Sequence, residues 1–177
     1  MARVHEARVD LGGRSACAGR VARVPAPVRV SEGKQRALGD ILARHEGERI
    51  LVFTADNATA YAIARAFLVA PVTHEIGRNE RADLLSRFRA GQVTVLVSSH
   101  VPDEGIDVPD ADIAIIVGGP SSSRRHVQGI GRVLRPRGGK RALVYELVVE
   151  HTAETGYAAR RRVGLDEQSH ARLGDST

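Results

Sequence analysis

Short runs of hydrophobic residues alternate with amphipathic segments along most of the chain. The continuous apolar runs at residues 49–54, 93–97, 113–117 and 142–149 are typical of strands that are buried on both faces of a parallel sheet. Between these runs, hydrophobic residues recur at helical spacing, which predicts amphipathic helices. Strands that alternate with helices in this way predict an α/β fold in which a parallel sheet lies between layers of helices on both of its faces.

Capping residues and glycines mark the ends of the predicted helices. Ser31 is a candidate N-cap for a first helix that stops at Gly47, and Asn79 is a candidate N-cap for a later helix that stops at Gly91. The other helices are expected to begin at Asn57 or Thr59, to span residues 122–134 and to span residues 153–163.

The chain divides into an arm, one domain and a tail. Residues 1–30 show no clear periodic pattern, carry six arginines and end in a Pro-Ala-Pro break, so we expect a basic, loosely ordered arm. Residues 31–165 hold all the predicted strands and helices and form the domain, and residues 166–177 are a polar tail. A chain of 177 residues with 42% hydrophobic residues has room for one domain with an ordinary core.

Composition excludes several classes of protein. A single cysteine, Cys17, rules out an internal disulfide and a multi-thiolate zinc site, and the seven histidines show no ligand spacing, so we expect no metal site. With 3% aromatic residues and no tryptophan, the chain cannot build an aromatic platform for stacking bases. The apolar runs are too short to cross a membrane and no signal peptide is present, so we expect a soluble, cytoplasmic protein.

The net charge of +5 is unevenly distributed, and 24 of the 26 basic residues are arginine. GC-rich coding inflates arginine without any physical reason, whereas an arginine excess that serves a function favours phosphate partners. Residues 118–145 contain seven basic residues and no acidic one. Without this stretch and the first 30 residues, the chain has 13 basic and 19 acidic residues, a segregation that coding bias alone would not produce.

Two parts of the sequence carry candidate chemistry. Gln128 and Arg132, in the predicted helix at 122–134, share one face with Arg135 directly after it, and two guanidinium groups there suit a phosphoryl group whose charge grows in a transition state. A solvated basic face is the alternative. In the loop after the strand at 93–97, Ser99 can donate to a phosphate and Asp107 can accept from a ribose, although an ordinary turn at Gly105 would explain the same residues.

The ordered combination of segments is more specific than any one of them. Residues 50–54, Arg81 with residues 88–91, residues 95–109 and residues 123–135 together resemble the C-terminal RecA-like domain of superfamily-two helicases. Within that superfamily they are similar to the XPB-like DNA helicases, whose motifs IV, V and VI correspond to these stretches. The resemblance covers about residues 34–163 and implies a three-layer RecA-like fold.

The resemblance implies roles for individual residues. Arg132 and Arg135 correspond to the arginine fingers of motif VI, which reach the γ-phosphate of ATP bound on the partner domain, and Gln128 corresponds to the motif VI glutamine on the nucleotide side. Asp107 corresponds to the motif V acid that faces the ribose or these arginines. The remaining implied nucleotide contact is Gly105, and the implied nucleic-acid contacts are Thr54, Ser99, Arg81 and Arg124.

The sequence departs from the family in two ways. Gly129 stands where motif VI usually has an arginine, and no Gly-x4-Gly-Lys-Ser/Thr phosphate-binding loop occurs anywhere: Gly33-Lys34, for example, is followed by Gln35. Asp103-Glu104 lies in the motif V loop and not in a magnesium-binding context. The resemblance therefore implies that Mg²⁺ and the phosphates of ATP are held by a Walker-type N-terminal domain that this sequence lacks.

The expected function follows from this missing half. The chain would be the C-terminal half of an ATP-dependent, XPB-like DNA helicase and a hydrolase only together with a Walker-type RecA-like domain in cis or in trans. Its nucleic-acid partner would be DNA, with RNA as the alternative. The competing interpretation is a non-enzymatic adaptor, derived from a helicase, that binds nucleic acid or protein.

Overall fold

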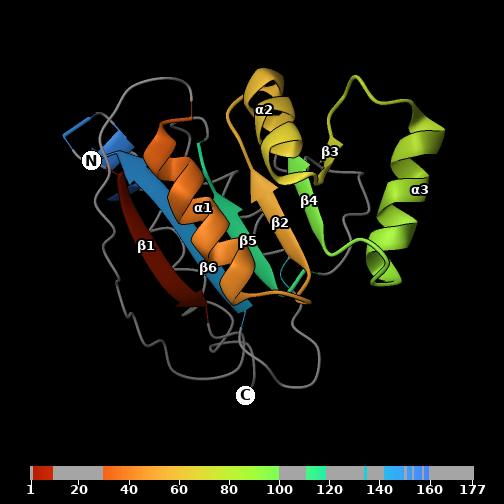
Figure 1. Ribbon diagram of the computed structural model, residues 1–177, viewed down its shortest axis with the longest axis horizontal. Coiled ribbons are helices and arrows are strands. Elements are labelled where there is room, and N and C mark those ends of the chain that lie inside the picture. Colours follow the sequence, from red (N-terminus) through yellow and green to blue (C-terminus); the bar gives the residue numbers. More distant parts are fainter. Residues whose placement is uncertain are drawn as a thin grey trace, which may run out of the picture.

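A six-stranded sheet organises the chain, with the strand order β1-β6-β5-β2-β4-β3 (Figure 1). The computed structural model describes residues 30–99, 111–118, 134, 142–149 and most of 151–159, together with the backbone of residues 2–9. The elements are β1 (Ala2–Val9), α1 (Glu32–Arg44), β2 (Ile50–Phe53), α2 (Asn57–Phe67), β3 (Ala70–Val72), α3 (Arg78–Arg89), β4 (Val95–Ser98), β5 (Ile113–Ile116) and β6 (Ala142–Val149).

Five of the strands form a parallel sheet, as the continuous apolar runs predicted. In the middle of the sheet, β2 pairs with β4 on one side and with β5 on the other, so that Ile50 lies opposite both Val95 and Ile113. All four residues of β2 and all four of β5 are buried, because side chains pack against both faces of these strands. The strands begin or end within a few residues of the predicted bounds.

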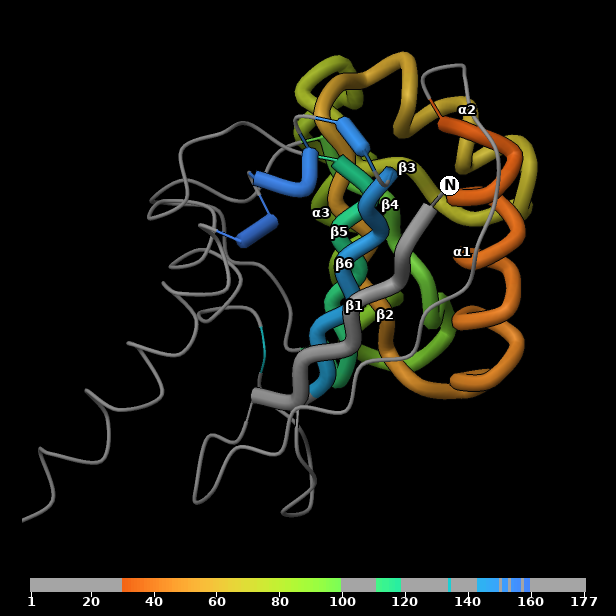
Figure 2. Tube along the Cα trace, turned by 90° about the vertical axis from the view of Figure 1, so that its left-hand side faces the viewer, coloured from red at the N-terminus to blue at the C-terminus, as the bar shows by residue number. Residues whose placement is uncertain are grey.

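Two layers of side chains pack against the sheet, one on each face. Alternate strand residues such as Val52 and Ile115 pack with α1 and α2, whereas Phe53 and Ile116 pack with Leu85 and Phe88, the two buried residues of α3. Figure 2 shows α1 and α2 together on one side of the strands. This three-layer arrangement confirms the predicted fold class.

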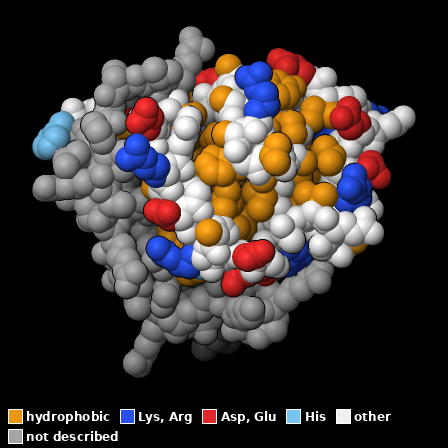
Figure 3. All heavy atoms as spheres, viewed as in Figure 1, with side chains coloured by type: hydrophobic (Ala, Val, Ile, Leu, Met, Phe, Trp, Pro, Cys, Tyr) orange, Lys and Arg blue, Asp and Glu red, His pale blue; other side chains and the backbone are white. Residues whose placement is uncertain are grey.

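The two helices α1 and α2, which cover one face of the sheet, pack closely together. They leave apolar surface exposed on their outer side. Gly39 of α1 faces the ring of Phe67 of α2, where a Cβ atom at position 39 would lie 3.3 Å from the ring. On this side of the molecule, hydrophobic side chains gather over α2 and beside α1 (Figure 3). Leu68, the C-cap of α2, is 93% exposed.

The helix ends agree with the sequence at some positions and differ at others. The Ser31 hydroxyl accepts a hydrogen bond from the Lys34 N–H, as expected of an N-cap, and Gly47 and Gly91 adopt positive φ angles of 84° and 75° just after α1 and α3. The prediction that Asn79 caps α3 is wrong. That helix begins earlier, after Gly77, and has no side-chain cap, so Asn79 lies inside its first turn.

The N-terminal residues differ from the expected loose arm. Ala2–Val9 form β1, which pairs with β6 in antiparallel register over its whole length, from Ala2 opposite Val149 to Val9 opposite Ala142 (Figure 1). The expectation was wrong for these residues because backbone hydrogen bonds to the edge of β6 stabilise this strand, and a hydropathy pattern does not predict such bonds. Residues 10–29 lie outside the described part of the chain, as does most of the predicted helix at 122–134.

Candidate functional site at the carboxyl edge of the sheet

The carboxyl ends of the parallel strands meet at one edge, where ligands bind in open α/β sheets. β2 leads into Thr54 and then into α2, β4 leads into Ser99, and β5 leads into Val117 and Gly118. Because β2 lies between β4 and β5, the first residues of these three loops are neighbours at this edge. Two of the predicted nucleic-acid contacts, Thr54 and Ser99, are therefore brought together by the fold.

Thr54 is buried and joins the ends of β2 and β4. Its hydroxyl donates to the carbonyl of Asp56 at 3.0 Å and lies 3.4 Å from the carbonyl of Ser98, while its own N–H donates to the Ser98 carbonyl at 2.9 Å. The residue is 2% exposed. These bonds stabilise the turn into α2, and contact between the Thr54 hydroxyl and nucleic acid stays a prediction.

Ser99 belongs to a network of side chains from three loops. Its hydroxyl donates to the side-chain carbonyl of Asn57, the first residue of α2. The Asn57 amide in turn donates to Glu75 at 2.8 Å and lies 3.3 Å from His74 Nδ1, both on the loop that follows β3. We call Asn57, His74, Glu75 and Ser99 the edge network. The sequence indicates Asn57 only as a helix start, since nothing local in the sequence pairs it with Ser99.

Arg81 reaches the same region from α3. Its guanidinium donates to the carbonyl of Thr73 at 2.6 Å, and the Thr73 hydroxyl lies 2.9 Å from the hydroxyl of Tyr61 on α2. Within the described part of the chain, the buried Nε of Arg81 has no hydrogen-bond partner. Arg81 therefore ties α3 to the loop after β3, beside the edge network.

Hydrogen bonding within this region lowers the pKa of Glu75. The largest cause is the bond from the Asn57 amide, followed by a bond from Tyr61, and the nearby His74 acts in the same direction. Because these groups stabilise the carboxylate form, the pKa of Glu75 lies below its ordinary value despite a small opposing effect of desolvation. Glu75 is therefore a carboxylate at neutral pH, with the Asn57 amide as its main hydrogen-bond donor.

Replacing Asn57 by Ala is expected to raise the pKa of Glu75 toward the ordinary carboxyl value, because the main donor to the carboxylate is lost. Since the folded-state pKa lies below the unfolded one, Glu75 contributes stability above the ordinary carboxyl pKa, and this is lost as the pH falls through the folded value. An NMR titration of the Glu75 carboxyl carbon measures the shift, with Asn79→Ala on the exposed start of α3 as the matched control. An unchanged Glu75 titration in Asn57→Ala would contradict the assigned cause.

The other predicted site residues lie outside the described part of the chain: Gly105, Asp107, Arg124, Gln128, Arg132 and Arg135. Leu134, which lies between the last two in sequence, is described. It is 1% exposed, packs on the α3 face of the sheet and forms a parallel bridge with Ala111 just before β5. The chain is therefore anchored in the core at Leu134.

The described residues contain neither a candidate metal-binding cluster nor a candidate membrane-spanning helix. No group of three or more histidines, cysteines or acidic residues there lies close enough together to hold a metal ion. None of the helices in that part is both long enough and apolar enough to span a membrane.

Comparison with known proteins defines the class to which this sheet and edge belong. The family of helicase conserved C-terminal domains matches residues 33–137. Over 76% of this chain and 80% of the other, the fold is shared with the C-terminal domain of the DEAD-box protein Dbp5, with a TM-score of 0.64 at 19% sequence identity. The chain belongs to the helicase C-terminal domain family, and its fold is that of a superfamily-two RecA-like domain.

Curated relatives narrow this class further. The chain is 42% identical over 132 residues to the DNA 3'-5' translocase XPB2 of Sulfurisphaera tokodaii, covering 75% of this chain and 30% of the relative. It is 38% identical over 133 residues to the DNA 3'-5' helicase XPB of Mycobacterium tuberculosis, covering 73% of this chain and 24% of the relative. These findings confirm the resemblance to XPB-like helicases, although the chain spans less than a third of the length of either relative.

Proposed function

We propose that this chain acts as the C-terminal half of an ATP-dependent, XPB-like DNA helicase. The observation that carries the proposal is the family match over residues 33–137, on a sheet whose carboxyl edge gathers Thr54, Ser99 and the edge network. The relatives named above are a DNA translocase and a DNA helicase, which supports DNA as the partner. A rice DEAD-box ATP-dependent RNA helicase, 32% identical over 119 residues, keeps RNA as the alternative.

In this proposal the chain's arginines act on a nucleotide held mainly by another domain. Arg132 and Arg135 would contact the γ-phosphate of ATP, with Gln128, Asp107 and Gly105 on the same side of the nucleotide. ATP supplies the phosphoryl group, whose negative charge spreads over its oxygens as it is transferred. The burial of Leu134 supports this assignment, because Leu134 precedes Arg135 and lies two residues after Arg132 in the sequence, and preorganised donors stabilise such a charge without a reorganisation cost.

Nucleic acid would bind along the same edge of the sheet through its backbone. Thr54 and Ser99 lie at the ends of the adjacent strands β2 and β4, and Arg81 lies beside them. Hydroxyl and guanidinium donors of this kind contact phosphates without reading the sequence of bases. Arg124 would add a further phosphate contact. Binding of this type should weaken as the salt concentration rises.

The phosphate-binding loop and the Mg²⁺ site would come from a Walker-type RecA-like domain in cis or in trans. The sequence contains no phosphate-binding loop of its own. The chain alone is therefore expected to hydrolyse no ATP, and closure of the two domains around the nucleotide would drive movement along the strand.

Mixing the chain with a separately expressed Walker-type domain of an XPB-like helicase tests the proposal. DNA-stimulated ATP hydrolysis is expected from the mixture, and neither part alone should show it. A steady-state phosphate-release assay with and without single-stranded DNA measures this, with RNA of the same length as a comparison. DNA binding by the chain without any turnover in the mixture would instead support the adaptor interpretation.

A further inference from the structure

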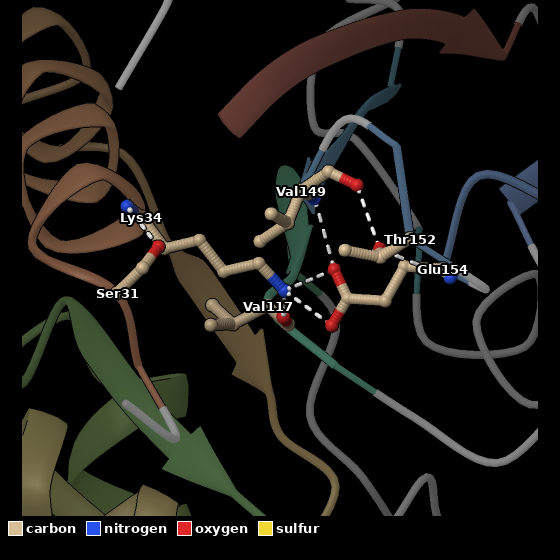
Figure 4. Close-up of polar contacts among 6 residues, drawn as sticks. All are labelled: Ser31, Lys34, Val117, Val149, Thr152 and Glu154. Carbon is tan, nitrogen blue, oxygen red and sulfur yellow. Dashed lines mark hydrogen bonds and ion pairs between the residues drawn. The ribbon is translucent and has the colours of Figure 1, made fainter. Parts of the chain in front are cut away.

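One polar cluster at the carboxyl edge of the sheet is closed to ligands. Lys34, in the first turn of α1, is 3% exposed, and its Nζ donates to the carbonyl of Val117 at 2.7 Å and lies 2.9 Å from Oε1 and 2.8 Å from Oε2 of Glu154 (Figure 4). Val117 follows β5 directly, and Glu154 follows β6, where its Oε2 also accepts from the N–H of Val149 at 2.9 Å. These bonds join the start of α1 to the ends of two strands, and burial keeps the ammonium group away from a ligand.

The edge network, at the ends of β2, β4 and β3, reaches solvent at one of its members. Ser99 is 5% exposed, Asn57 is partly buried, and Glu75 is exposed. The hydrogen bonds follow the same order, because the Ser99 hydroxyl donates to the Asn57 side-chain carbonyl and the Asn57 amide donates to Glu75 Oε1 at 2.8 Å. The Asn57 side chain therefore lies between a predicted phosphate contact and an exposed carboxylate.

The loop after β3 places Glu75 against Asn57. Thr73 is buried, its carbonyl accepts from the Arg81 guanidinium at 2.6 Å, and its hydroxyl lies 2.9 Å from the hydroxyl of Tyr61. The backbone is thus anchored two residues before Glu75. Because the Glu75 side chain is exposed, its carboxylate can leave Asn57 by a change of rotamer, without movement of this anchored backbone.

A phosphate group would offer the Asn57 amide the same kind of acceptor as Glu75 does. Both acceptors are anionic oxygens at neutral pH, and hydrogen bonds to charged oxygens are stronger than those to neutral ones. Amide side chains are among the groups that contact nucleic-acid phosphates. A phosphate that reaches the Ser99 hydroxyl would lie next to Asn57, since the two side chains are hydrogen-bonded to each other. It would also meet the Glu75 carboxylate, which has the same sign of charge.

We propose that Asn57 is a further phosphate-binding residue at this edge and that Glu75 occupies its amide until nucleic acid displaces the carboxylate. The inference rests on the proposed function, which places nucleic acid at Thr54, Ser99 and Arg81. Glu75 would lower the affinity in two ways, because its bond to Asn57 has to be exchanged and because the carboxylate repels the incoming phosphate. The contact between Asn57 and Glu75 is therefore autoinhibitory.

Binding of single-stranded DNA by the full chain, measured by fluorescence anisotropy at low salt, tests this exchange. Glu75→Gln keeps an acceptor for Asn57 but removes the charge, so it should lower the Kd about threefold to fivefold, the effect of one exposed charge interaction. Glu80→Gln is the matched control, since Glu80 is also exposed, lies in the first turn of α3 and takes no part in the edge network. It should change the Kd by less than about twofold.

A double-variant cycle with Asn57→Ala separates the exchange from simple repulsion. If Glu75 acts through Asn57, the gain from Glu75→Gln should fall below about twofold in the Asn57→Ala background, because no amide remains to bind the phosphate. An equal gain in both backgrounds would mean that Glu75 only repels the phosphate, and it would overturn the role of Asn57. An equal gain from Glu80→Gln would overturn the role of Glu75.

A second measurement uses the wild-type chain and does not depend on how well Asn57→Ala folds. In a heteronuclear NMR spectrum, the side-chain amide signals of Asn57 should shift when single-stranded DNA is added. Those of Gln92, which is exposed beyond the other end of α3, should stay in place. If the chain and its variants bind no DNA, the nucleic-acid part of the proposed function fails and the exchange fails with it. If the chain binds DNA while the Asn57 signals stay unchanged, only the exchange is overturned.

Discussion

Replacing Arg135 by Ala is expected to lower ATP hydrolysis by the chain and its Walker-type partner about a thousandfold, at the lower end of what arginine fingers contribute. The guanidinium would neutralise charge that appears on the transferred phosphoryl group only in the transition state. The loss should therefore appear in kcat, with little change in the KM for ATP. Arg135→Lys should recover only part of the rate, because an ammonium group cannot form the bidentate contact.

Arg137 provides the matched control for this prediction, since it lies in the same basic stretch and carries no assigned role. Arg137→Ala should leave kcat within about twofold, which single-turnover and steady-state assays with DNA would measure together with Arg135→Ala. The alternative interpretation, a solvated basic face, predicts similar small effects for both variants. A common small effect would therefore reject the finger assignment for Arg135.

Replacing Arg49 by Met is expected to lower the free energy of unfolding by about 3 kcal/mol, because it removes the Arg49 guanidinium from a largely buried ion pair with Asp112. The side chains of Arg49 and Asp112 are 7% and 18% exposed, and Asp112 also accepts from the Arg49 N–H at 3.2 Å. That backbone bond survives the substitution, so the effect should lie near the lower end of the range for a broken buried pair.

Urea unfolding followed by circular dichroism measures this loss against an exposed pair of the same type. Arg36 and Glu32 on α1 form an ion pair with side chains 71% and 80% exposed, and Arg36→Met should change the unfolding free energy by less than about 0.5 kcal/mol. The double variant Arg49→Met with Asp112→Leu should regain most of the lost stability. Equal effects of Arg49→Met and Arg36→Met would show that burial does not govern the strength of these pairs.

The residues at the carboxyl edge of the sheet differ in how far the sequence reveals them. Thr54 and Ser99 were predicted as site residues because they follow buried strands, and parallel strands bring such residues to one edge. Asn57 and Lys34 were not predicted, because the partners that define them lie far away in the chain. Ser99 is 42 residues from Asn57, and Glu154 is 120 residues from Lys34.

Local sequence patterns and ordered motifs were enough to predict the α/β class, the parallel sheet, the Ser31 cap, the glycines after α1 and α3 and the helicase family. These features can be predicted from local periodicity, capping residues and ordered motifs, each of which involves only a few neighbouring residues. Hydropathy reports whether a residue is buried but does not report its partner.

The assembled fold, and no local pattern, shows that Ala2–Val9 form a sixth strand and that α3 begins after Gly77. It also shows that Lys34 joins the exits of β5 and β6. The strand β1 depends on backbone hydrogen bonds to β6, some 140 residues away. The Lys34 contacts depend on a carboxylate that the turn after β6 holds in place. Such contacts form only when the whole sheet is assembled, which is why no local pattern predicts them.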